Sequence, residues 1–161
     1  MANSRNRTQV TGDRTPRNMD IYQEKDGMKG VAYCSCGVVY HGKRWQSGNG
    51  APQAGRKLSC PACRRTADNM PAGIISLRGD FLASHEAEIT NLIRNTEQAT
   101  AQKNPLGRVI ETLKERDGIT ITTTDGKLAQ KIGREVFKSY GGELNFLWNQ
   151  SEDLVRVAWF R

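Results

Sequence analysis

The spacing of hydrophobic and polar positions changes near residue 74 of this 161-residue chain. Beyond that point, apolar residues recur at every second position or at three- and four-residue intervals, as in strands and helices that bury one face. Before it, apolar residues are few, and Gly, Pro, Ser and Asn interrupt them. The pattern therefore predicts a packed domain over residues 74–161, preceded by segments that cannot form a hydrophobic core by themselves.

Seven elements are predicted within this domain. Asp80 and Asp125 stand where an acidic residue caps a helix, and Pro105 prevents the first helix from continuing. Asp117-Gly118, between two segments of alternating pattern, is a hairpin signal. The elements in order are strand 74–77, helix 80–98, strand 109–116, strand 119–124, helix 126–140, strand 144–148 and strand 155–159. This order, β-α-β-β-α-β-β, indicates an α+β fold with helices against a mostly antiparallel sheet.

The four cysteines form two close pairs, C-x-C and C-x2-C, separated by 23 residues. Structural zinc takes four thiolate or imidazole ligands in a tetrahedron, and two cysteine pairs on tight turns supply them. Because residues 30–73 have little aliphatic mass, a bound metal is expected to organise them as a zinc ribbon. No carboxylate lies close to the pairs in the sequence, so the site should be closed and structural. The expected Zn²⁺ ligands are Cys34, Cys36, Cys60 and Cys63.

The first pair is one residue shorter than the usual C-x-x-C, which leaves alternatives open. His41 follows Cys36 by five residues and could replace one thiolate of this pair. The cysteines could also be a redox pair or four unrelated thiols. Two pairs in a segment with no other means of folding favour a metal over both.

The surplus of positive over negative charge lies entirely in the first half of the chain. The net charge is +7, of which residues 1–30 carry +2 and residues 31–73 carry +5, whereas residues 74–161 are neutral. A surplus at one end favours a polyanionic partner, nucleic acid first. Residues 1–29 are polar without an apolar period and are expected to form a flexible, disordered basic arm. The candidate RNA contacts are His41, Lys43, Arg44, Arg56, Lys57, Arg64 and Arg65.

Several function classes are disfavoured by the sequence. No stretch approaches the roughly 18 apolar residues of a membrane helix, and the first ten residues lack the apolar region of a secretory signal. We therefore expect a cytoplasmic protein with reduced thiols. A Gly-rich phosphate loop, a nucleophile elbow and a Cys/His dyad are all lacking, so we expect neither an enzyme nor a small-molecule substrate.

The chain resembles a family of small bacterial zinc-ribbon proteins of uncertain function, through the runs CSCGVVYHGKRW, CPAC, PAGIISLRGDFLASHEAEI and DGITITTTDGKLAQKIG. The resemblance covers residues 12–161. The layout is also similar, more distantly, to the amino-terminal part of the nonsense-mediated-decay-type adaptor that escorts the large ribosomal subunit. There, a cysteine-pair zinc module precedes a strand, a helix, a DG hairpin and another helix. Cys34 stands one residue later than the first ligand of that family's C-x-x-C.

The resemblance implies ribosomal RNA as the partner, contacted by the basic zinc module, with ribosomal proteins as further partners. We therefore expect a zinc-binding, non-catalytic protein that binds structured RNA on the ribosome. The alternative is a protein-interaction adaptor in which the zinc ribbon docks a partner protein. A metal-dependent or redox enzyme is a third hypothesis, which would need an exchangeable ligand or a reactive thiolate.

Overall fold

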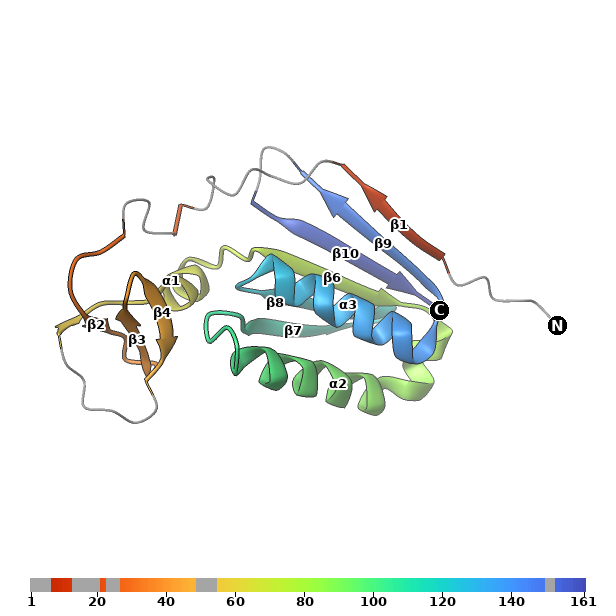
Figure 1. Cartoon of the computed structure of the whole chain (residues 1–161). Coiled ribbons are helices and arrows are strands. Elements are labelled where there is room, and N and C mark those ends of the chain that lie inside the picture. The colour runs from red at the N-terminus through yellow and green to blue at the C-terminus, as the bar shows by residue number, and fades with distance from the viewer. Residues whose placement is uncertain (1–6, 13–20, 23–26, 49–54, 150–152) are drawn as a thin grey trace.

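The computed structural model describes residues 7–12, 21–22, 27–48, 55–149 and 153–161, which form two bodies (Figure 1). One body is a six-stranded sheet of order β1-β9-β10-β6-β8-β7 with two helices, here called the C-terminal domain. The other is a four-stranded sheet of order β4-β3-β2-β5 with one short helix, here called the cysteine module. With both helices and strands, the fold is of the α+β class.

The alternating pattern from residue 73 onward forms the C-terminal domain. Its elements are β6 (Gly73–Arg78), α2 (Asp80–Ala101), β7 (Val109–Glu115), β8 (Gly118–Thr123), α3 (Gly126–Tyr140), β9 (Glu143–Trp148) and β10 (Val155–Phe160). Within this sheet, β6–β8, β7–β8 and β9–β10 pair antiparallel, while β6–β10 pairs parallel. Asp125 caps α3 by accepting the Lys127 N–H, whereas α2 begins after Gly79 without a side-chain cap.

Helices α2 and α3 lie together on one face of this sheet (Figure 1). Every second residue of β6 and β10 is buried beneath them, because successive side chains in a strand point to opposite faces. Ile75, Leu77 and Ile121 are completely buried in this core, and Trp159 donates its indole N–H to the Gly141 carbonyl at 2.7 Å. Within the described segments, none of the helices combines the length and apolarity needed to span a membrane.

Part of the segment predicted as a disordered arm is a strand. Residues Arg7–Thr11 form β1, which pairs in parallel with β9 at the edge of the six-stranded sheet. All five residues are exposed, so the hydrophobic pattern gives no sign of the strand. Backbone hydrogen bonds to an open sheet edge need no particular side chains, which explains the difference from the prediction. The remainder of the predicted arm lies largely outside the described residues.

The cysteine module contains β2 (Ala32–Tyr33), β3 (Val38–His41), β4 (Arg44–Ser47), β5 (Arg56–Lys57) and α1 (Pro61–Asp68). Both cysteine pairs were predicted to lie on tight turns of a ribbon. In the structure only the first pair lies on a turn, between β2 and β3, and the second pair lies at the start of α1. Pro61 accounts for this difference, because proline is favoured in the first turn of a helix.

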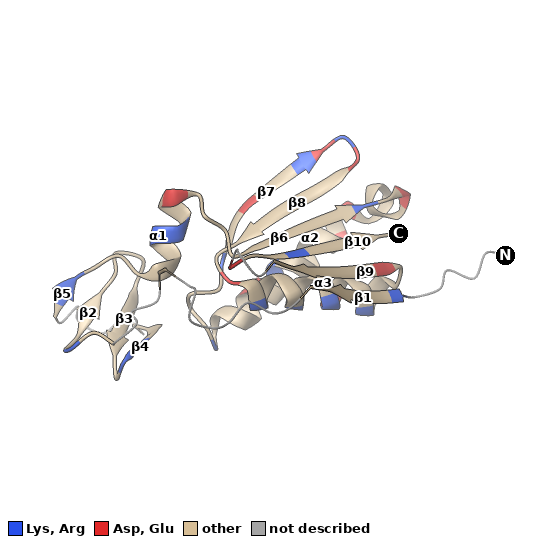
Figure 2. Cartoon of the chain, turned by 90° about the horizontal axis from the view of Figure 1, so that it is seen from above, with Lys and Arg blue, Asp and Glu red and all other residues tan. Residues whose placement is uncertain are grey.

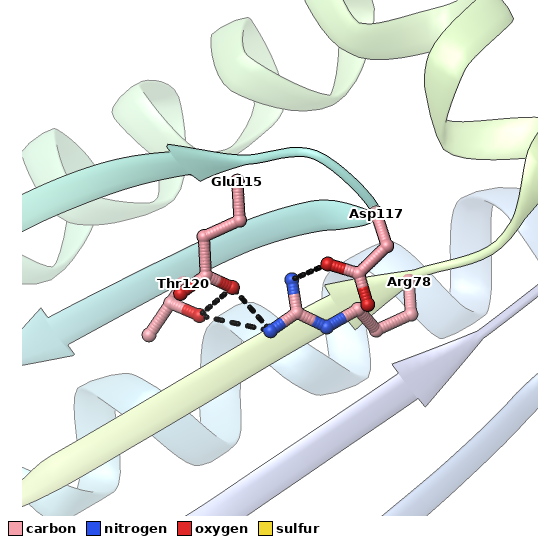
Figure 3. Close-up of polar contacts among 4 residues, drawn as sticks. All are labelled: Arg78, Glu115, Asp117 and Thr120. Carbon is pink, nitrogen blue, oxygen red and sulfur yellow. Dashed lines mark hydrogen bonds and ion pairs between the residues drawn. The ribbon is translucent and has the colours of Figure 1, made fainter.

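A polar cluster fixes the far end of the C-terminal domain (Figure 3). The Arg78 guanidinium on β6 pairs with Glu115 and, at 3.5 Å, with Asp117 of the β7–β8 hairpin. Thr120 donates its hydroxyl to the same Glu115 carboxylate at 3.2 Å. One guanidinium thus pairs with both carboxylates, and we assign the cluster to holding the hairpin on the sheet.

Candidate metal centre

The two cysteine pairs meet in one cluster. All four Sγ atoms lie within 4.8 Å of one another. Cys34 Sγ lies 3.7 Å from Cys63 Sγ, and Cys36 Sγ lies 3.7 Å from Cys60 Sγ. These distances are too long for disulfides, and all four thiols are free. A tetrahedral ion with metal–sulfur bonds of about 2.3 Å requires sulfurs about 3.8 Å apart, so the four side chains fit a metal ion.

The first pair is presented by the turn between β2 and β3. The Cys34 N–H donates to the Val38 carbonyl at 2.9 Å, and the Gly37 N–H donates to the Cys34 carbonyl at 3.0 Å. Gly37 has a φ of 99°, a left-handed conformation that residues other than glycine rarely adopt. This glycine therefore allows the shortened C-x-C pair to turn sharply enough for both sulfurs to face the cluster.

The second pair is presented by the first turn of α1. Cys60 is the N-cap residue, and its Sγ accepts the Cys63 N–H at 3.4 Å. The spacing of three residues places both sulfurs on the same side of the helix start. Free N–H groups and the helix dipole favour negative charge there, and the Cys63 N–H acts to lower the pKa of Cys60, but burial outweighs it.

The four sulfurs differ in exposure and in proton affinity. Cys34 and Cys60 are buried, Cys63 is half-buried and Cys36 is exposed. Burial raises the pKa of Cys60 and of Cys63. Burial also acts to raise the pKa of Cys36, but hydrogen bonds from the Val38 backbone and from Arg108 outweigh it and lower that pKa to about 6. The exposed Cys36 sulfur is thus more readily ionised near neutral pH than the sulfur of Cys60 or Cys63.

Arg108, in the segment just before β7, is a functional residue that no sequence motif indicated. Its guanidinium donates to Cys36 Sγ at 3.1 Å and to Cys63 Sγ at 3.6 Å, and lies 4.0 Å from Cys60 Sγ. A hydrogen bond from its Nε to the Pro105 carbonyl orients it. Burial lowers the pKa of Arg108, but the cysteine sulfurs raise it more, so its charge is retained. Four thiolates around a divalent ion would leave a net negative charge, which the Arg108 guanidinium would partly neutralise.

Replacing Arg108 with Met should weaken Zn²⁺ binding by about 10-fold, because residues that hydrogen-bond metal ligands typically contribute 10–100-fold to affinity. The Zn²⁺ affinity of Arg108→Lys should lie between those of the wild type and Arg108→Met. An ammonium keeps the charge but cannot contact several sulfurs as the planar guanidinium does. Competition with a chromogenic chelator would measure the affinities. Arg116→Met, at an exposed position beside the same strand, is the control. Equal affinities for the Arg108 and Arg116 variants would contradict this role.

His41 lies outside the cluster. It is exposed at the end of β3, where the β3–β4 turn begins, while Cys34 and Cys36 both belong to the group that could hold a metal. The cluster therefore does not need the histidine that the shortened first pair left as an alternative ligand.

The predicted RNA contacts fall into two groups: residues with exposed side chains, and residues whose side chains are bonded to other parts of the protein. Exposed are His41, Lys43, Arg44, Arg56 and Lys57. By strand pairing, His41 stands opposite Arg44, and Lys57 stands opposite Tyr33. Because side chains alternate between faces, the four side chains of His41, Arg44, Tyr33 and Lys57 share the face opposite buried Tyr40. We call this the outer face of the cysteine module.

Arg64 and Arg65 are engaged in packing instead. Arg65 is only 6% exposed, and its guanidinium pairs with Asp153 at 3.2 Å and donates to the Met70 carbonyl at 3.0 Å. Arg64 is half-buried and donates to the Tyr22 carbonyl at 3.0 Å. The ion pair between the buried Arg65 guanidinium and the exposed Asp153 carboxylate ties α1 to the C-terminal domain, which leaves little of Arg65 exposed for the RNA contact that the sequence predicts. Neither residue enters the surface considered below.

No family model, curated protein or solved structure matches this chain.

Proposed function

We propose that this chain is a zinc-binding, non-catalytic RNA-binding protein that contacts structured RNA, ribosomal RNA foremost, through its cysteine module. Zinc is the metal of choice because four thiolates are soft ligands and tetrahedral sulfur sites are typical of structural zinc. The thiols stay reduced in a reducing compartment, for which the cytoplasm is our proposal. In this role the metal is structural: it holds the turn of the first pair against α1 and so shapes the basic surface.

The observation that carries this proposal is that nearly all charged residues of the cysteine module are positive. Between residues 27 and 73 the sequence has seven Lys and Arg but a single acid, Asp68. In Figure 2 the blue cations follow β4, β5 and α1, while the red acid of this module lies at the end of α1. The Asp68 carboxylate accepts the Tyr22 hydroxyl at 2.8 Å. A surface of this kind attracts phosphates and releases their counterions on binding.

The outer face adds an aromatic ring to these cations. Tyr33 is half-buried on β2, next to exposed Lys57 on β5, with His41 and Arg44 on the strands at its other side. Aromatic rings among Lys and Arg allow bases to stack while phosphates pair with the cations. The aromatic side chains of Tyr40 and Trp45 lie on the other face of this sheet, where Tyr40 is buried and Trp45 is half-buried. Only the pairing register of the strands, which the sequence does not reveal, places Tyr33 among these cations.

The proposal is tested by RNA binding of the zinc-loaded full chain at several salt concentrations. With phosphate contacts from Lys43, Arg44, Arg56 and Lys57, log K should fall against log salt with a slope of about −3. That slope corresponds to about a 60-fold loss of affinity between 50 and 200 mM salt. Fluorescence anisotropy with a labelled rRNA fragment would measure it, and sedimentation of lysate would test ribosome association.

Two outcomes would count against the proposal. Micromolar or tighter binding that is insensitive to salt would show that the basic surface is not the contact. A cellular partner that remains bound after nuclease treatment would favour the alternative, in which the cysteine module docks a partner protein.

A further inference from the structure

A cavity lies between the cysteine module and the C-terminal domain. Its volume is about 410 Å³, within the range typical of small-ligand pockets. Tyr40, Trp45 and the β3–β4 turn line it from the module, and Leu106 and Lys127 line it from the domain. Figure 1 shows the start of α3 at the end of the domain that faces the module. Both bodies are therefore needed to form the cavity.

The cavity is positively charged. Its lining has four cations and one carboxylate, that of Asp125. Both oxygens of this carboxylate are already in use, one accepting the Lys127 N–H at 3.2 Å and the other accepting Asn104 Nδ2 at 3.3 Å. Arg65 is engaged by Asp153 and the Arg44 side chain belongs to the outer face, whereas Lys43 and Lys127 are exposed and in no ion pair within the described segments. These two cations remain to bind an anion.

An aromatic wall stands beside these cations. Trp45 is half-buried and meets Tyr40 edge to face, with ring centroids 5.4 Å apart and planes inclined by 65°. Tyr40 and Trp45 therefore form an aromatic side of the cavity next to its cations.

We propose that this cavity binds one unpaired nucleotide of the RNA, with its base against Trp45 and its phosphate between Lys127 and Lys43. This inference rests on the proposed function and adds to it a defined subsite and the participation of the C-terminal domain. Paired bases remain stacked inside a duplex, so only an unpaired nucleotide can place its base on a protein ring. The arrangement of an aromatic ring with flanking cations is the one that binds single-stranded nucleic acid.

The experiment compares two charge reversals on α3 in the zinc-loaded full chain. Lys127→Glu reverses a cation of the cavity, and Lys131→Glu reverses an exposed cation one turn further along the same helix, outside the cavity. The probes are a single-stranded oligouridylate, its deoxy counterpart, a fully paired RNA duplex and uridine monophosphate. Lys127→Glu is expected to weaken oligouridylate binding about 10-fold, because it removes a phosphate contact and adds repulsion, while Lys131→Glu changes it less than about 2-fold.

Tryptophan fluorescence reports directly on the base. Oligouridylate should quench the tryptophan fluorescence of the wild-type protein, and this quenching should disappear in Trp45→Phe. That variant keeps an aromatic ring in the module but removes the indole. Trp148 and Trp159 remain in that variant as internal references. Retained quenching in Trp45→Phe would overturn the assignment of the base to this wall.

The outcomes separate the subsite from the proposed function. Equal losses in Lys127→Glu and Lys131→Glu, with wild-type RNA binding intact, overturn the subsite alone. The subsite is also overturned if the paired duplex competes as well as the oligonucleotide does, or if uridine monophosphate binds as tightly, since the latter identifies a free nucleotide as the ligand. Equal affinity for the deoxy probe would make the ligand single-stranded nucleic acid in general and overturn the restriction to RNA. Failure of every RNA to bind overturns both proposals.

Discussion

Removing the metal should unfold the cysteine module and leave the C-terminal domain folded. The module buries few apolar side chains, Ala32, Val38, Tyr40 and Ala62, beside the candidate metal ligands Cys34 and Cys60. The C-terminal domain instead has sixteen buried core residues of its own. Binding of structural zinc contributes about 10 kcal/mol or more of folding free energy to modules of this kind, far more than such a core supplies.

Cys60→Ser tests this in the sharpest way. Cys60 caps α1 as well as contributing a sulfur to the cluster, and serine is a strong N-cap residue, so the helix cap is retained while the thiolate is lost. Amide NMR signals of residues 27–70 are expected to collapse to unfolded positions, with those of β6 to β10 largely unchanged, and the protein should lose its stoichiometric metal. Ser59→Ala is the matched control beside it. Amide signals of the module that stay at folded positions in Cys60→Ser, or in wild-type protein after chelation, would contradict this prediction.

The double charge reversal Arg44→Glu and Lys57→Glu should weaken RNA binding on the order of 100-fold at physiological salt. Each variant removes a phosphate contact and places a carboxylate on the outer face, where it repels the backbone. The slope of log K against log salt should become shallower by about 1.5 units, because two contacts are lost. Both side chains are exposed, so the fold should tolerate the changes. Anisotropy titrations at several salt concentrations measure both quantities.

Arg94→Glu with Lys131→Glu makes the same change in net charge on the exposed surfaces of α2 and α3. This control should lower affinity by only a few-fold, through the weaker long-range attraction of the whole protein. If the control and the outer-face variant lose affinity equally, net charge alone governs binding and the outer face is not the contact surface. Variants of Arg64 or Arg65 could not make this distinction, since their side chains hold the packing around Tyr22.

The C-terminal domain was largely predictable because its hydrophobic periodicity is strong. Ile119, Ile121 and Thr123 alternate with polar neighbours and lie on the buried side of β8. The face of α3 was likewise visible in the spacing of Leu128, Ile132 and Val136, all completely buried. Where burial of side chains stabilises a helix or strand, the hydrophobic periodicity of the sequence reveals that element. Strand β1 and the short strands of the module depend on backbone pairing instead, and left no such pattern.

Residue type, local spacing and composition were enough to identify the four clustered sulfurs that could hold a metal ion, the α+β class and the concentration of positive charge near the cysteines. Which cations face solvent depended on the three-dimensional arrangement: Arg65 is buried in an ion pair, and Arg108 reaches the sulfurs from another body. The 24 Lys and Arg residues look alike in the sequence. What distinguishes them is which distant segments approach each one, because only that approach sets its burial and its partners.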